Sequence, residues 1–191
     1  MATKPEVEDQ EYIAFVGLYE TANKEGYLGA MLIADTHGVP GEFRCTHPVK
    51  PNPIQKPLYG HTLEYHIGVN LCGVPLIKAA QLKPRIIVVN REVLLDIRLG
   101  IEIPVSFIRR AGEAIEIRDA NSNETSGRDR LDCPTGKFNP IMIYSNPRFA
   151  NDQIFIREFL AQNFGHLDPL EPFERIETAI KVLGEQDKRF Q

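Results

Sequence analysis

The sequence has few cysteines, no long apolar segment and no excess of basic residues, and each absence excludes a class of protein. Its three cysteines are an odd number at wide spacing, which indicates neither a disulfide framework nor a zinc motif. No apolar run approaches the roughly 20 residues of a membrane-spanning helix, and the acidic first ten residues lack the apolar core of a secretion signal. We therefore expect free thiols, a cytoplasmic location and no membrane partner.

The charge balance argues against general binding to nucleic acid. The formal net charge is −4 at pH 7, so the surface as a whole does not attract a polyanion. Such binding would need one local patch formed by Arg44, Lys50, Lys56, Arg85, Arg109 and Arg110. Without that patch, the acidic balance favours a protein partner.

Signatures of nucleotide, metal and cofactor binding are also missing. The segment after the most apolar run, Val88-Val-Asn-Arg-Glu, contains none of the glycines of a phosphate-binding loop. His61 and His66 flank Glu64, but on a helix a separation of five residues places two side chains roughly 140° apart, so they share no metal-binding face. We expect no metal site and no cofactor.

The apolar run Ile86-Ile-Val-Val predicts a strand covered on both faces, as in the centre of a parallel sheet. A short helix over 91–99 and a strand over 105–109 complete a βαβ unit. Residues 12–19 predict a first strand, and residues 27–48 an antiparallel hairpin in which Gly29 marks a bulge or a close neighbour. Further strands are expected over 113–118 and 140–144, followed by two C-terminal helices, the second beginning at Pro172.

The connection between the hairpin and the apolar strand is expected to be helical. A helix beginning near Pro53, capped by Asn52, should turn Leu58, Leu63 and Ile67 inward. Gly68 and Gly73 are expected to interrupt it. The whole pattern predicts an α/β fold: a disordered lead over residues 1–10, then a single domain over residues 11–191 with a mixed sheet of about six strands and helices on both faces.

Three groups of residues are candidates for function. Cys45 and His47 alternate along a strand and share a face, so they could form a nucleophile and base pair with Asp35 nearby. Asn90 and Arg91 at the end of one parallel strand, and Arg109 and Arg110 at the end of the next, could hold a phosphate or another anion. The polar segment 119–137 is expected to be without regular structure; it could order on a protein partner through Arg128, Asp129, Arg130 and Asp132, or be a flexible solvated loop.

No candidate group forms a recognisable catalytic constellation, so the sequence does not favour an enzyme. It indicates a non-catalytic binding or regulatory subunit that acts within a larger cytoplasmic protein assembly. The alternatives are a small hydrolase that uses Cys45 with His47, and anion-directed chemistry at Arg91, Arg109 and Arg110.

Overall fold

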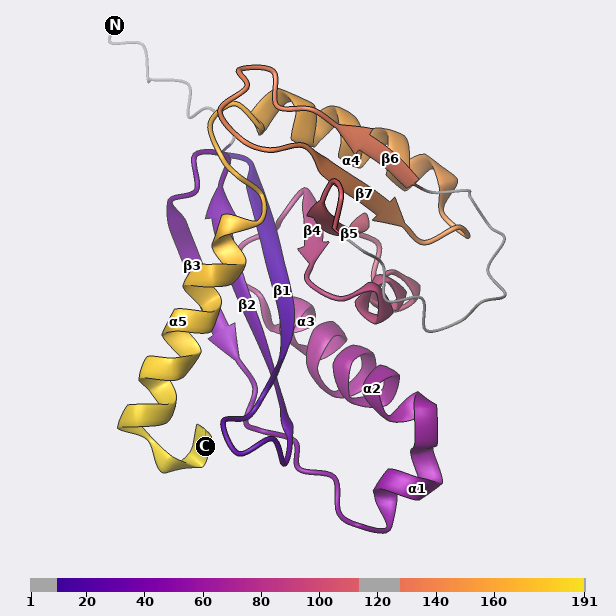
Figure 1. Cartoon of the computed structure of the whole chain (residues 1–191), viewed down its shortest axis with the longest axis vertical. Helices are drawn as coiled ribbons and strands as arrows, with labels where there is room; N and C mark the ends of the chain where they lie inside the picture. Colours follow the sequence, from indigo (N-terminus) through magenta and orange to yellow (C-terminus); the bar gives the residue numbers. More distant parts are fainter. Residues whose placement is uncertain (1–9, 114–127, 191) are drawn as a thin grey trace, which may run out of the picture.

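The computed structural model describes residues 10–113 and 128–190 and confirms the expected fold class, a single α/β domain built on one mixed sheet (Figure 1). The sheet has seven strands in the order β3-β2-β1-β4-β5-β7-β6. The strands are β1 (Tyr12–Glu20), β2 (Tyr27–Asp35), β3 (Pro40–Cys45), β4 (Ile86–Val89), β5 (Val105–Arg110), β6 (Arg128–Leu131) and β7 (Ile141–Ser145).

The centre of the sheet is parallel, as the sequence predicted. β4 pairs in parallel with β1 on one side and with β5 on the other, and all other pairings are antiparallel. All four residues of β4 are 0% exposed. Alternation along the strand sends Ile86 and Val88 into one core cluster and Ile87 and Val89 into the other, so both faces of β4 are covered.

Helices cover the two faces with different segments. α4 (Ala150–Asn163) and α5 (Glu171–Gln186) pack on one face, and the segment between β3 and β4 packs on the other together with the 3₁₀-helix η3 (Glu92–Leu99). The remaining elements are α1 (Gln55–Tyr59), η1 (Gly60–Thr62), α2 (Leu63–Tyr65), the π-helix η2 (His66–Gly73), α3 (Val74–Ala79) and η4 (Lys188–Phe190). The two C-terminal helices are therefore confirmed.

The beginning of the helical connection differs in part from the prediction. Asn52 caps it as expected, because its side-chain oxygen accepts hydrogen bonds from the backbone N–H groups of Ile54 and Gln55. Ile67 is buried, but Leu58 is 77% exposed, so its predicted inward orientation is wrong. The physical reason is that α1 extends beyond the sheet, as Figure 1 shows, and has no strand beneath it.

Gly68 and Gly73 do not interrupt this connection; both lie inside η2. A Cβ atom at Gly73 would stand 2.3 Å from Cδ1 of Ile97, and one at Gly68 would stand 2.9 Å from Cδ2 of Leu94. The glycines thus allow the helix to approach η3 closely. Gly29 has a similar role, because a Cβ atom there would stand 2.5 Å from Cβ of Cys72.

Two further predictions concern segments that the structure describes only in part. Residues 1–9 of the predicted disordered lead and nearly all of the predicted strand over 113–118 lie outside the described residues. Within the segment 119–137, the expected lack of regular structure is wrong for residues 128–131, because they form β6 and pair with β7. Among the described helices, none is long and apolar enough to cross a membrane.

Candidate nucleic-acid interface

One face of β5, β7 and β6 carries side chains that the described helices cover only in part. α4 packs against the opposite face of these three strands (Figure 1). On the near side, Phe107 of β5 and Tyr144 of β7 pack at the margin of the core cluster to which η3 contributes. We call this surface the open face and define it by the residues Phe107, Arg109, Met142, Tyr144, Arg128 and Arg130. Arg128 and Arg130 are exposed, and the other four are half-buried.

The open face arises from simple alternation along the strands. Ser106 and Ile108 of β5 are buried on the side of α4, so Phe107 and Arg109 between them point to the other side. In the same way, burial of Ile141 and Ile143 turns Met142 and Tyr144 of β7 toward the open face. Antiparallel pairing then places Arg128 and Arg130 of β6 beside them.

The register orders these side chains into two rows across the three strands. The first row contains Phe107, Tyr144 and Arg128, and the second contains Arg109, Met142 and Arg130. Neighbouring strands lie about 4.8 Å apart and successive rows about 7 Å apart. Two aromatic rings are thus next to one another, with arginines on the neighbouring positions.

Contacts hold the centre of the open face in place. The rings of Phe107 and Tyr144 have centroids 5.5 Å apart and an interplanar angle of 35°. Nε of Arg109 donates a hydrogen bond of 2.8 Å to the hydroxyl of Tyr144, and a second guanidinium N–H donates to the carbonyl oxygen of Glu113. The Arg109 guanidinium carbon lies 5.4 Å from the centroid of the Tyr144 ring. This arginine is therefore positioned before any ligand binds.

The outer part of the open face is more accessible. Arg130 forms an ion pair of 2.9 Å with Asp132, and the two side chains are 58% and 66% exposed. Ion pairs this exposed contribute little to stability, so an incoming phosphate can compete with Asp132 for the guanidinium. Arg128 is exposed as well.

The side chains predicted to bind a partner do not share one face, because successive side chains along β6 point to opposite sides of the sheet. Arg128 and Arg130 lie on the open face, whereas Asp129 points to the other side and forms an ion pair of 2.6 Å with Arg157 of α4. Sequence reasoning missed Phe107, Met142 and Tyr144. The available signal was the alternation of Phe107 and Arg109 with Ser106 and Ile108 along the predicted strand over 105–109.

Asn90 and Arg91 lie where β4 separates from β1, the point at which the strand order reverses. The backbone N–H of Asn90 still donates to the carbonyl of Val16 at 3.3 Å, but its side-chain oxygen accepts from the N–H of Leu18 at 3.1 Å. Arg91 donates to the carbonyl of Leu18 at 3.0 Å and to Glu64 at 2.8 Å. Both residues thus support the end of β1.

Tyr19 lies near the end of β1 and packs on the other face of the sheet. Its ring lies over Gly17, where a Cβ atom would stand 2.4 Å from the ring. The hydroxyl is buried and has no hydrogen-bond partner among the described residues. Burial, together with the nearby Glu177 carboxylate, raises the pKa of Tyr19.

The predicted anion site does not come together as one cluster. Arg109 belongs to the open face, whereas Arg110 points to the opposite side of β5, where it donates to Asp168 and to the carbonyl of Asn139. The larger basic patch does not form either. Arg85 precedes β4 while Arg109 and Arg110 end the parallel strand β5, so they lie at opposite ends of the sheet.

The thiol, imidazole and carboxylate of the alternative hydrolase site are also apart. Cys45 pairs with Ala30 of β2. Ala30 and Asp35 are five residues apart along that strand, a distance of roughly 16 Å. Asp35 accepts hydrogen bonds from the backbone of its own turn, and the ring of His47 stacks on Phe190 at 5.2 Å. Burial raises the pKa of the Cys45 thiol.

Among residues 10–113 and 128–190, no three or more side chains of His, Cys, Asp and Glu converge to hold a metal ion.

No family model and no curated protein matches the sequence. The fold is similar to solved structures of endonuclease V. The enzyme from Ciona intestinalis, in complex with a 23mer DNA that contains an inosine followed by a ribo-adenosine, is 11% identical, with a TM-score of 0.45 and coverage of 78% of this chain and 77% of that chain. Endonuclease V from Bacillus subtilis is 13% identical, with a TM-score of 0.43 and coverage of 77% and 71%. Marinitoga piezophila Argonaute in complex with a 5′ OH guide RNA is 11% identical, with a TM-score of 0.33 and coverage of 78% and 26%.

This similarity corrects the functional expectation from the sequence. A non-catalytic regulatory subunit defined by protein interactions is contradicted, because the solved structures that the chain resembles include endonucleases. The TM-scores of these structures are all below 0.5, so no site, substrate or reaction is carried over from them. The proposal below rests on the open face itself.

Proposed function

We propose that this chain binds single-stranded nucleic acid on the open face of β5, β7 and β6. The observation that carries the proposal is the pair of neighbouring aromatic side chains, Phe107 and Tyr144, with Arg109, Arg128 and Arg130 around them. Both rings are half-buried, and the part of each that remains exposed offers a surface to an unpaired base, while an arginine beside it can bind the phosphate that links one base to the next.

The geometry favours a single strand over a duplex. In a duplex the bases are stacked on one another, and their faces cannot reach a side chain, whereas the bases of a single strand can turn outward and stack on a protein ring. Stacking of this kind contributes about 1 to 3 kcal/mol per base and is tolerant of sequence. The net charge of −4 restricts the attraction to the neighbourhood of the three arginines.

Fluorescence anisotropy tests the proposal with labelled oligonucleotides of about 12 nucleotides, single-stranded or as a duplex. We expect the unaltered chain to bind the single strand more tightly than the duplex. The double variant Arg128→Glu/Arg130→Glu should lose most of this binding, because it places two carboxylates beside the phosphates.

A matched control makes the same change in charge on a remote surface. Lys181 lies on α5 and Lys188 in η4, so Lys181→Glu/Lys188→Glu alters the net charge equally without touching the open face. It should retain binding. Equal losses in the two double variants, or equal affinity for single strand and duplex, would refute the proposal.

A further inference from the structure

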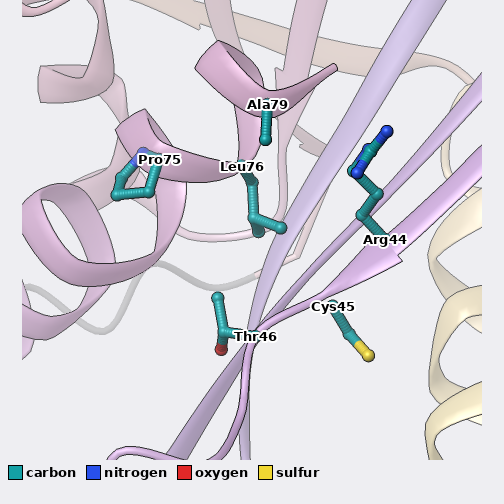
Figure 2. Close-up of a pocket in the computed structure, with 6 residues that line it drawn as sticks. All are labelled: Arg44, Cys45, Thr46, Pro75, Leu76 and Ala79. Atoms are coloured by element: carbon teal, nitrogen blue, oxygen red, sulfur yellow. The ribbon is translucent and has the colours of Figure 1, made fainter. Parts of the chain in front are cut away.

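A groove lies beside β3, which forms the edge of the sheet opposite to β6. Its cavity of about 320 Å³ is bounded by β3 and α3, and its lining residues are Arg44, Cys45, Thr46, Pro75, Leu76 and Ala79. Figure 2 shows Leu76 and Thr46 on the side of α3, whereas the side chain of Cys45 points away from them. The sulfur of Cys45 therefore takes no part in the groove.

The backbone of β3 next to this groove has an open hydrogen-bonding edge. The N–H of Thr46 donates to the carbonyl of Gly29 on β2 at 2.9 Å, so Thr46 faces inward. In an antiparallel ladder, inward and outward residues alternate, and Phe43 and Cys45 therefore direct their N–H and C=O groups away from β2. Among the described strands, β3 pairs with β2 alone. These outward groups are available to one more extended chain.

The side chains of the groove indicate the chemistry of its occupant. The floor formed by α3 is largely apolar, from Pro75, Leu76 and Ala79. At the rim, the side chain of Arg44 is 33% exposed, whereas that of its partner Glu42 is only 10% exposed and also accepts from backbone N–H groups. The accessible charge at the rim is thus positive.

We infer that this groove binds an extended peptide, which pairs with β3 as an added strand. Side chains of an added strand alternate between the two faces, so every second one would point toward α3. An apolar side chain then fills the cavity over Leu76, and an acidic side chain two residues away lies beside Arg44. The peptide gains affinity from the outward groups of Phe43 and Cys45, and specificity from the cavity.

A second copy of the chain fits this edge less well. Two β3 strands related by a two-fold axis at Phe43 would place Gly41 of each opposite Cys45 of the other. The β2–β3 pairing is irregular between Ile33 and Ala34, where Gly41 is the extra residue on β3. The bulge disturbs the outward ladder at that point. A peptide that pairs with Phe43 and Cys45 alone does not reach Gly41 and so avoids the bulge.

The test selects binders from a phage library that displays random ten-residue peptides, with the full chain immobilised. We expect enriched peptides to share an apolar residue and an acidic residue two positions apart. Amide hydrogen exchange, followed by NMR, should slow about tenfold or more at Phe43 and Cys45 when a selected peptide is added.

Two variants and one control separate the groove from the rest of the molecule. Ala79→Glu places a carboxylate in the groove on an exposed helical position, and Phe43→Pro removes an outward N–H, which an edge strand tolerates. Each substitution should lower the affinity for the selected peptides about tenfold or more. Circular dichroism checks that each variant is folded. If Phe43→Pro unfolds the chain, Ala79→Glu alone provides the test. Ala150→Glu, the same substitution at an exposed position of α4, should leave binding unchanged.

Three results would overturn the inference. The first is enrichment no greater than on an uncoated surface. The second is equal binding of the selected peptides to the chain and to Ala79→Glu. The third is a dimer in sedimentation equilibrium whose amides at Phe43 and Cys45 are already protected without peptide, since a second copy would then occupy the edge.

Discussion

Tyr144 combines two functions on the open face, and they can be separated by substitution. Its ring offers a stacking surface next to Phe107, and its hydroxyl accepts the hydrogen bond that positions Arg109. Tyr144→Ala removes both and should weaken single-strand binding by about 5- to 150-fold, the equivalent of 1 to 3 kcal/mol. Tyr144→Phe keeps the ring and should lose less. Anisotropy titrations of both variants measure the difference, and equal losses would contradict base stacking on this ring.

At the scale of single residues, the sequence identified charged side chains but not their partners. Arg110 was a predicted ligand-binding residue, yet its guanidinium is held by Asp168, 58 residues further along the chain. Arg91 is held in the same way by Glu64. Only Arg109, Arg128 and Arg130 face one common surface, and they do so because β5 and β6 both pair with β7. That pairing has no local signal in the sequence.

At the scale of elements, Glu42 connects the edge strand β3 to the segment that precedes β4. Its carboxylate accepts hydrogen bonds from the N–H groups of Gln81 and Leu82, and it pairs with Arg44. Burial by itself would raise the pKa of Glu42, but the bonds from Leu82, Arg44 and Gln81 outweigh it and lower this pKa below its ordinary value. A carboxyl group whose pKa is lowered by folding stabilises the folded chain above its unfolded pKa, and this contribution is lost as the pH falls through the folded pKa.

Glu42→Gln should therefore lower the free energy of unfolding by about 1 to 3 kcal/mol at pH 7, and by progressively less as the pH falls through the pKa of Glu42 in the folded chain. Urea unfolding at pH 7 and at a series of lower pH values measures this dependence. Glu25→Gln is the control, because Glu25 is 67% exposed and its contact with Lys50 is long, at 3.9 Å. A loss at Glu42 that stays the same across the pH series would contradict the role given to its charge.

Elements with a strong hydrophobic pattern were predicted from the sequence, and elements shaped by distant contacts were not. The buried run of β4 and the apolar stripe of α5 follow from local periodicity, because the residues that define them are adjacent on one strand or one helix. The glycines of η2 were misinterpreted for the opposite reason. Gly73 is required by Ile97, a residue of a different element, and a glycine that permits close packing has the same local appearance as one that ends a helix.

At the scale of the whole molecule, an acidic chain that binds a polyanion must do so through a small number of contacts. With three arginines on the open face, counterion release from a single strand predicts a slope of about −2 when the logarithm of the binding constant is plotted against the logarithm of salt concentration. Arg130→Gln should make this slope less steep by about 0.7, while Lys181→Gln on α5 should leave it unchanged. Titrations at several salt concentrations give the slope directly. A much steeper slope, or an equal change in both variants, would mean that the nucleic acid spreads over basic residues outside the open face.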